Sequence, residues 1–423
     1  MKHTTGTICL GKERGTSREF SLFVDVTRSD RQSELAQHVF LLGSPGSGKT
    51  TTIMLLVDGA LLNGYGVVIV DCKGGGLGDA AKRLAERYGV DFFLVDPEEP
   101  TGLGYDPCSG NEIEVSNKLT GAFTFSDKAE IYKNVVLSIL PPLHRAMTSA
   151  GVPVTIEALI DALDDVGMRD LGARAGEPYS TELEKARKTG RTGKEGYSGL
   201  QLRFAALQQG DFGKVFEKRP ALEWDVAGAR PSVTYLALRA TGAGEDVELM
   251  GRVVAQDLKQ LASRRLRQIR RGQPPPPMLV IFDEFAALRE PEPIIDLLRQ
   301  ARESLMPVVL ATQVLPETYH IREASLSAGL HIVHRCTDEA IKAVVAQWGT
   351  RPTTEVSRQI NLETGETAMG SIHKGETYVL HPNELRNLRT GQAAVRSIAR
   401  HSPRPTILQI HREAQGDPTH GHT

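Results

Sequence analysis

Hydrophobic residues in the first hundred positions alternate between short unbroken runs and helical spacing. Val39 to Gly43, Tyr65 to Asp71 and Phe92 to Asp96 are the near-continuous apolar runs. Between them, apolar residues recur three and four positions apart, first at 53, 56, 57 and 60 and then at 81, 84, 85 and 88. A strand that is apolar throughout is buried on both faces, as in a parallel sheet covered by helices. The pattern therefore predicts a doubly wound α/β core.

The pattern changes in the middle of the chain. From about Cys108 to Pro231 it indicates helices joined by polar loops, such as Lys185 to Gly199, with few candidate strands. Strands then resume at Val233 to Leu238, and a long helical pattern runs from about Glu245 to Arg270. The middle stretch is therefore expected to be an inserted, mainly helical domain.

The second half of the core is predicted from the same pattern. Met278 to Phe282 and Val308 to Thr312 are further buried strands, with a helix from about Pro293 to Leu305 between them. The last predicted strands are Glu376 to Leu380, Ala393 to Ile398 and Thr406 to Ile410. These elements predict a strand segment in residues 1–30, an α/β core formed by residues 31–107 and 231–412, an inserted helical domain in residues 108–230, and a disordered tail in residues 413–423.

Composition places few limits on function. The 50 Lys and Arg residues against 52 Asp and Glu residues give a formal net charge of -2, so any nucleic-acid-binding surface must be local. The four cysteines are far apart and show no metal-ligand spacing, which is typical of unpaired thiols in a reducing cytoplasm. The start lacks an apolar signal region, and the longest apolar candidate for a membrane span, Ile53 to Leu62, is too short. We therefore expect a cytoplasmic protein.

A glycine-rich loop between the first core strand and its helix is the clearest chemical signal. It matches G-x-x-x-x-G-K-[ST] and reads Gly43, Ser44, Pro45, Gly46, Ser47, Gly48, Lys49, Thr50, followed by Thr51. Glycines let successive backbone N–H groups curl around a phosphate, and the helix that follows directs its positive dipole end at the same point. Lys49 is expected to neutralise the β- and γ-phosphates of ATP, and Thr50 to ligate Mg²⁺.

Two carboxylates end the strand that begins at Met278. Asp283 is expected to hold Mg²⁺, and the adjacent Glu284 to polarise the attacking water. A nucleotide-binding switch needs no second carboxylate as a general base, whereas a hydrolase does. This pair therefore favours hydrolysis over binding alone.

Two further residues are candidates for catalysis. Gln313 ends the next apolar strand, at the sheet edge where open α/β folds bind their ligands, and is a candidate γ-phosphate sensor. Arg302 lies on the predicted helix before that strand, at the edge of its packed face. From there it could reach the phosphate of a neighbouring subunit or pair with a surface acid.

Together these residues resemble the FtsK/HerA superfamily, and within it the coupling proteins of conjugation and type IV secretion. The segments that resemble it are His38, the phosphate loop, Val68 to Gly74, Tyr105 to Pro107, Ile281 to Phe285 and Ala311 to Gln313. The resemblance implies a RecA-like, mainly parallel sheet with an inserted all-helical domain, and an ATP-hydrolysing motor that moves DNA. It assigns Lys49, Thr50, Asp283 and Glu284 to hydrolysis, Gln313 to the third motif, and Arg302 to the arginine finger.

The resemblance also implies partners. They are DNA held through its backbone without sequence preference, other copies of the chain in a hexamer, and a relaxase or nuclease. Coupling proteins usually carry transmembrane helices before the nucleotide domain, so a separate membrane-anchoring subunit is a further expected partner, with the chain at the inner face of the membrane. The family's Asp-Pro-Lys-Gly loop reads Asp71-Cys72-Lys73-Gly74 in this chain.

Two basic clusters are candidates for DNA contact. Arg264, Arg265, Arg267, Arg270 and Arg271 crowd a helix end, where cations complement the dipole and a solvated face is expected. The second cluster, Lys185, Arg187, Lys188, Arg191 and Lys194, lies in the predicted glycine-containing loop and is the better candidate. Neither cluster has interleaved aromatic residues, so base stacking is not indicated.

Other classes of nucleotide-binding protein have weaker support. A guanine-nucleotide switch needs Asn-Lys-x-Asp, and the string from Asn117 to Thr120 lacks the Asp. An ABC-type ATPase needs Leu-Ser-Gly-Gly-Gln, which Tyr197 to Gln201 matches only in part. A soluble HerA-like ATPase with a DNA-processing or defence partner and a nucleotide-dependent regulatory switch stay open as alternatives.

Overall fold

The computed structural model describes residues 6–25, 33–74, 76–123, 130–191, 196–210, 212–238, 244–288, 292–357, 371–401 and 403–412. The chain divides into two compact units. The first consists of Met1–Leu56, Ala311–Leu315 and Arg322–Thr423, and the second of Val57–Leu310 and Pro316–Ile321. The predicted tail, residues 413–423, lies outside the described residues.

The first unit is organised around the strand that leads into the phosphate loop. This strand, β3, pairs in parallel with β9, which continues antiparallel through β12, β13, β1 and β2. The bounds are β1 Thr7–Glu13, β2 Glu19–Phe23, β3 Val39–Leu42, β9 Leu330–Val333, β12 Gln392–Ser397 and β13 Thr406–Ile410. The strands β3 and β9 are buried along their whole length, as expected for the middle of a covered sheet.

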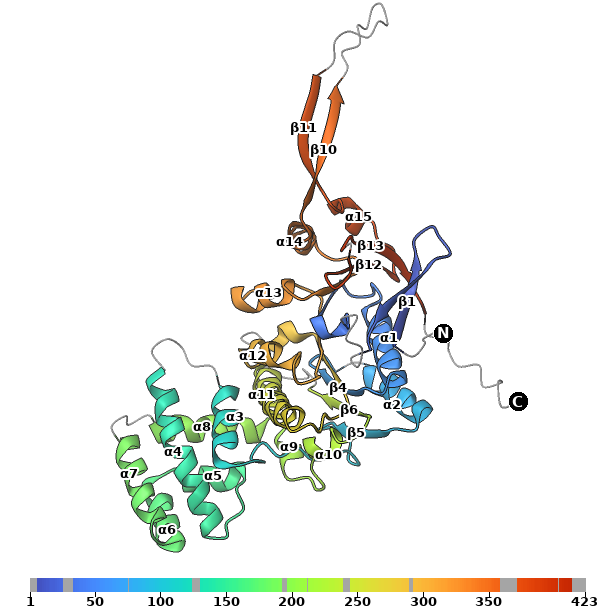
Figure 1. Ribbon diagram of the computed structural model, residues 1–423. Coiled ribbons are helices and arrows are strands. Elements are labelled where there is room, and N and C mark those ends of the chain that lie inside the picture. The colour runs from blue at the N-terminus through green and yellow to red at the C-terminus, as the bar shows by residue number, and fades with distance from the viewer. Residues whose placement is uncertain are drawn as a thin grey trace, which may run out of the picture. The chain divides into compact units, whose positions relative to one another are not determined.

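The remaining elements of the first unit follow β9. They include α14 Asp338–Trp348, α15 Pro382–Arg386 and a separate two-stranded antiparallel ribbon of β10 Thr350–Ser357 and β11 Ser371–Tyr378. Figure 1 shows the ribbon extending from the region of α14 and α15. A 3-10 helix, η1 Leu35–Gln37, precedes β3.

The strands β4, β5, β6 and β7 of the second unit pair with one another in parallel. β4 pairs with both β6 and β7, and β6 pairs with β5. The bounds are β4 Gly66–Asp71, β5 Asp91–Val95, β6 Ser232–Ala237 and β7 Met278–Asp283. Helix α2 Leu77–Tyr88 lies between β4 and β5 and ends as predicted at Gly89 in the left-handed conformation, and α12 Glu292–Ala301 follows β7.

Three of the described elements contribute residues to both units. Two are α1 Lys49–Leu62 and β8 Val308–Thr312, whose bounds agree closely with the predicted helix and strand, and the third is α13 Tyr319–Leu326. The hydrogen-bonded strand order is β2-β1-β13-β12-β9-β3-β8-β7-β4-β6-β5. The predicted α/β fold with a mainly parallel sheet is confirmed, with antiparallel strands added beside β9.

Helices fill the stretch between residues 108 and 230. They are α3 Glu112–Ala122, α4 Glu130–Ser149, α5 Ile156–Ala162, α6 Asp165–Ala175, α7 Tyr179–Arg191, α8 Gly196–Gln209, α9 Gly213–Phe216 and α10 Trp224–Ala227. A full capping box at Asn111 begins α3, because its side chain accepts from Ile113 and Glu114 while Glu114 accepts from the Asn111 N–H. The boundaries of the inserted domain stay a prediction.

A buried ion pair ties α3 to the long helix α11 Gly244–Arg270. Lys118 Nζ lies 2.7 Å from Asp257 Oδ1, and the Tyr105 hydroxyl donates to the other oxygen of the same carboxylate. Both charged side chains are almost fully buried, so removing either partner would leave the other charge without compensation. Tyr105 belongs to the Tyr105 to Pro107 motif, which is therefore held against α11 by the same carboxylate.

Two predicted elements are wrong in detail. The helix predicted to reach Leu305 ends at Ala301, because Leu305 takes a left-handed backbone with φ 58 and Arg265 Nε binds the carbonyl of Ser304. The loop predicted from Lys185 to Gly199 is largely helical, since α7 extends to Arg191 and α8 begins at Gly196. Among the described residues, none of the helices is long and apolar enough to cross a bilayer.

Candidate nucleotide-binding site

The phosphate loop connects β3 to α1 in the first unit. Its entry is fixed by two backbone bonds, from the Gly43 N–H to Thr312 O at 3.2 Å and from the Ser44 N–H to Arg335 O at 2.8 Å. Gly43 must be glycine because a Cβ there would lie 2.6 Å from Ser47 Oγ and 2.7 Å from His334 Cβ. Gly48 has φ 115, which strongly favours glycine. The sequence therefore folds here into the curled backbone that binds phosphate.

The cation of the loop starts the following helix. Lys49 is the first residue of α1, and its Nζ donates to the carbonyl of Gly43 across the loop. Thr50 is exposed and Thr51 half-buried in the same first turn, where backbone N–H groups and the helix dipole favour an anion. The predicted phosphate-binding residues thus share one helix N-terminus with a positive charge.

A buried histidine supports this loop, and the sequence alone did not identify it. His334 follows β9, is fully buried, and donates its backbone N–H to Leu42 O at 2.8 Å, at the end of β3. Its Nδ1 lies 2.9 Å from the carbonyl oxygen of Gln392, so Nδ1 carries the proton. Its Nε2 then accepts from the hydroxyl of Thr52 at 2.9 Å, one helical turn into α1. The ring therefore links β9, the phosphate-loop helix and the start of β12.

His334 is neutral at ordinary pH. Burial, with a smaller contribution from the charge of Lys49, lowers its pKa from 6.5 to about 4, although the bond to Gln392 opposes this shift. A neutral ring leaves Lys49 as the nearby positive charge for a phosphate. The only sequence signal for this residue was a histidine directly after a short apolar run.

A second support comes from the loop before β12. The Gly391 N–H donates to Ser47 O at 2.9 Å, and a Cβ at Gly48 would lie 3.3 Å from the Gly391 backbone. Gly391 itself has φ 78. The phosphate loop is therefore held by the strand that precedes it and by segments more than two hundred residues later in the chain.

Gln313 lies at the end of β8, next to a residue that is hydrogen-bonded to Gly43. It directly follows β8, whose last residue, Thr312, accepts the N–H of Gly43. The Thr312 hydroxyl donates to Val314 O at 2.9 Å and fixes the turn that carries Gln313. Gln313 is half-buried, which suits a residue that senses a bound phosphate.

The carboxylates of the second unit end neighbouring parallel strands. Asp71 and Asp283 are register partners at the ends of β4 and β7, and the Cys72 N–H donates to Asp283 O at 3.1 Å. Asp71 is buried and accepts from the Tyr235 hydroxyl at 2.6 Å and from the N–H groups of Lys73 and Gly74. Both carboxylate oxygens of Asp71 therefore accept hydrogen bonds that hold the loop in place. Asp283 and Glu284, at the same edge, are half-buried.

The pKa of the Cys72 thiol reflects burial and the negative charge of these acids. Burial raises the pKa of its thiol well above the ordinary value, and the charges of Asp71, Asp283 and Glu284 add to the shift. This edge therefore favours a cation. The Asp283 carboxylate offers hard oxygen donors, the ligand type that Mg²⁺ prefers, so this residue fits the predicted ion by its chemistry, as the Thr50 hydroxyl does in the first unit.

Glu284 has a strained backbone. Its φ is 56, in the left-handed region that residues other than glycine rarely adopt, and its carbonyl accepts the Ala287 N–H at 2.9 Å to start η3 Phe285–Leu288. Such conformations persist where the surrounding structure enforces them, and they cluster at functional sites. The turn directs the chain away from the sheet directly after Asp283.

Arg302 is not where it was predicted. It lies one residue beyond α12 and is exposed, instead of at the edge of a packed helical face. The turn that carries it adjoins the start of β7, since the Met278 N–H donates to Leu305 O at 2.9 Å. A six-residue strand separates that edge from Asp283, roughly 17 Å at about 3.3 Å per residue. Arg302 therefore lies far from Asp283 and Glu284 of its own chain.

The two basic clusters are also corrected by the structure. Lys185, Arg187 and Lys188 lie on α7 instead of a loop, and Arg187 pairs with Glu184 at 2.6 Å and Asp165 at 3.4 Å. Lys194 and the side chain of Arg191 lie outside the described residues. In the other cluster Arg265 is buried, with a pKa lowered to about 10 by burial, and is not part of a solvated face.

Comparison with solved structures identifies the fold. No protein-family model and no curated protein matches the chain. The chain is similar to a VirB4 structure of Thermoanaerobacter pseudethanolicus, with 14% identity, a TM-score of 0.57, and 98% of each chain covered. The chain thus has a RecA-like ATPase fold.

Further similar structures are of a plasmid coupling protein, TrwB. Its complex with ADP and Mg²⁺ has 16% identity and a TM-score of 0.64, covering 98% of this chain and 96% of that one. Its complex with a non-hydrolysable ATP analogue has 16% identity and a TM-score of 0.63, covering 97% and 96%. At this identity the likeness establishes the fold, and it agrees with the resemblance to coupling proteins seen in the sequence.

Proposed function

We propose that the chain is a Mg²⁺-dependent ATPase that uses hydrolysis to move DNA, in the manner of conjugation and type IV secretion motors. The observation that carries this is the phosphate loop from Gly43 to Thr51, braced on both sides by buried contacts. The acidic edge formed by Asp283 and Glu284 supports hydrolysis over binding alone. The TrwB structure with ADP and Mg²⁺ supports the choice of nucleotide and ion.

Each residue has a role in this proposal. Lys49 and the first turn of α1 bind the phosphates, and Thr50 and Asp283 hold the ion, which draws charge from the phosphate oxygens when bound. Glu284 orients and polarises the attacking water, and Gln313 senses the γ-phosphate from the end of β8. Arg302 of a neighbouring copy supplies positive charge to the transition state, because it is exposed and lies far from Asp283 in its own chain.

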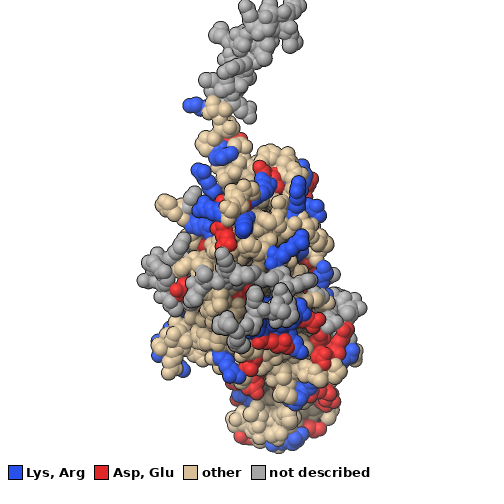
Figure 2. All heavy atoms as spheres, turned by 90° about the vertical axis from the view of Figure 1, so that its right-hand side faces the viewer, with Lys and Arg blue, Asp and Glu red and all other residues tan. Residues whose placement is uncertain are grey.

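DNA is the proposed cargo, bound through its backbone by a ring of six copies. Figure 2 shows, among the described residues of the face drawn, Lys and Arg side chains interspersed with Asp and Glu. A motor that grips DNA regardless of sequence needs only local basic positions on each copy, which a ring repeats around its channel. A relaxase or nuclease and a membrane-anchoring subunit are the proposed protein partners.

The test is ATP turnover with and without double-stranded and single-stranded DNA, over a series of salt concentrations. DNA should accelerate turnover, and the acceleration should fall steeply as salt rises, since phosphate contacts release counterions. Native mass spectrometry on the same samples should detect hexamers. Turnover that DNA does not change at any salt concentration would contradict the motor and favour a regulatory switch.

A further inference from the structure

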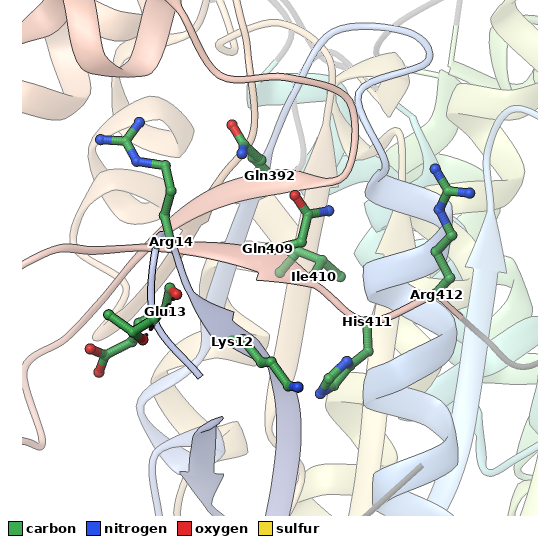
Figure 3. A pocket seen from close by; sticks show the side chains of 10 residues that line it. Lys12, Glu13, Arg14, Gln392, Gln409, Ile410, His411 and Arg412 are labelled. Carbon is green, nitrogen blue, oxygen red and sulfur yellow. Dashed lines mark hydrogen bonds between the residues drawn. The ribbon is translucent and has the colours of Figure 1, made fainter. Parts of the chain in front are cut away.

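A cavity of about 630 Å³ lies within the first unit. Residues that line it come from β1 and the turn after it, from the start of β12, and from β13 and the two residues that follow it. They include Lys12, Gln392, Gln409, Ile410, His411 and Arg412 (Figure 3). Its volume is within the range of small-molecule sites. Its charged side chains are the cations Lys12, Arg14 and Arg412 and the acid Glu13, and Ile410 supplies an apolar side chain.

The cavity is linked to the phosphate loop by hydrogen bonds. Gly391, the residue before Gln392, donates to Ser47 O in the loop, and its own carbonyl accepts the Ile410 N–H at 2.8 Å and Gln409 Nε2 at 3.1 Å. The carbonyl of Gln392 accepts from His334. Gln392, which lines the cavity, therefore directly follows the residue that contacts the phosphate loop. The backbone of residues 391 and 392 contributes both to the cavity wall and to the support of the loop.

Two amides face the cavity as a pair. Gln392 and Gln409 are register partners on β12 and β13, and Figure 3 shows them projecting side by side. Gln392 Oε1 accepts the Arg389 N–H and Gln409 Nε2 donates to Gly391, which leaves one amide NH₂ and one carbonyl oxygen without partners in the described chain. A donor beside an acceptor is complementary to the hydrogen-bonding edge of a nucleotide base.

The cations at the rim differ in their availability. Arg14 is paired with Glu384 at 2.6 Å. Lys12 and Arg412 are exposed and have no carboxylate partner within the part of the chain that the structure describes. A planar guanidinium stacks on aromatic rings, and a lysine donates to hydroxyl or phosphate oxygens.

We propose that this cavity binds the base and ribose of the nucleotide whose phosphates lie in the Gly43 to Thr51 loop. The inference rests on the proposed function and adds the residues that recognise the nucleoside. Gln392 and Gln409 hydrogen-bond to the base, Arg412 stacks on it, and Lys12 binds the sugar side. Because Gly391 joins the cavity to Ser47, filling the cavity also steadies the phosphate loop.

Calorimetric titration of the full chain with Mg²⁺, using ATP and inorganic tripolyphosphate as separate probes, tests the inference. Arg412→Ala and Gln392→Ala should each raise the Kd for ATP by about 2- to 12-fold, the size of one hydrogen bond or contact. Neither should change the Kd for tripolyphosphate, which needs only the loop. Arg404→Ala removes an exposed arginine outside the cavity and should change neither value.

Other outcomes would overturn the inference in distinguishable ways. Equal weakening of ATP and tripolyphosphate by both variants would mean that they only distort the loop. Unchanged ATP affinity with weaker DNA binding would assign the cavity to nucleic acid. Binding of neither probe by the unaltered chain would reject the proposed function itself, whereas Lys49→Ala should weaken both probes if that function is right.

Discussion

His334→Phe isolates the hydrogen bonds that brace the phosphate loop. Phenylalanine keeps the ring but leaves the Thr52 hydroxyl and the Gln392 carbonyl without their partner. An unsatisfied buried polar group costs about 1–3 kcal/mol, so the two together should lower the free energy of unfolding by about 2–6 kcal/mol. ATP affinity should fall as well, because Thr52 lies in the helix that begins at Lys49.

The loss of stability in His334→Phe should depend on pH in a defined direction. The pKa of His334 is about 4 in the folded chain, below the ordinary 6.5, so the unfolded chain takes up the proton first as pH falls. The neutral ring therefore contributes fully above about pH 6.5, and its contribution is lost as pH falls from 6.5 towards 4. The full difference between these two pKa values corresponds to about 3 kcal/mol in the free energy of unfolding. The difference between His334→Phe and the unaltered chain should thus shrink by about 2 kcal/mol between pH 7 and pH 5.

His331→Phe is the matched control. His331 lies on the same strand, is also buried, and has its pKa lowered to about 4, chiefly by burial. It accepts from Trp348 Nε1 at 2.9 Å, and among the described residues it has no hydrogen bond to the phosphate loop. Urea unfolding over a pH series should show the same pH effect for both variants, and calorimetry should show weakened ATP binding for His334→Phe alone.

Two results would refute this reasoning. A stability difference that does not change between pH 7 and pH 5 would show that His334 is not held neutral by folding. Unaltered ATP affinity in a folded His334→Phe protein would show that the ring is structural and has no influence on the loop.

Three further predictions follow from the site and its surroundings. Glu284→Gln should retain ATP binding and lose hydrolysis by at least about a hundredfold in single-turnover assays, the size of a general-base contribution; collapse of ATP affinity with persisting turnover would reject the role. Arg302→Ala should bind ATP without hydrolysing it, and mixing it with Glu284→Gln should restore part of the activity through interfaces with both intact groups; freely exchanging mixtures no more active than either parent would reject the role in trans. Arg187→Ala should lower thermal stability more than Lys188→Ala, because Arg187 pairs across helices with Asp165 and is mostly buried, and equal melting temperatures would contradict this.

The sequence predicted the elements whose local pattern is strong. The phosphate loop, β8 and α11 agree because glycine spacing, unbroken apolar runs and long helical periodicity are local properties. The end of α12 was missed because it depends on distant groups. Arg265, from another helix, binds Ser304 O. Leu305 takes a left-handed backbone, which is usually predicted from a glycine, but this position is a leucine.

The same distinction explains what was found of the site. Lys49, Thr50, Asp283 and Glu284 are recognisable because their chemistry requires fixed spacing from a strand. His334 and Gly391 act on the loop from segments far along the chain, and only the pairing of β9 with β3 and β12 brings them to it. The strain at Glu284 is likewise invisible in a sequence of ordinary residues.

The most direct test of the account is steady-state ATP turnover with Mg²⁺, measured for the unaltered chain and for Lys49→Ala. We predict that the unaltered chain hydrolyses ATP and that chelation of Mg²⁺ abolishes this turnover. The Lys49→Ala variant should be folded and lack turnover. Equal turnover in the two proteins, or no turnover in the unaltered chain with or without DNA, would contradict it.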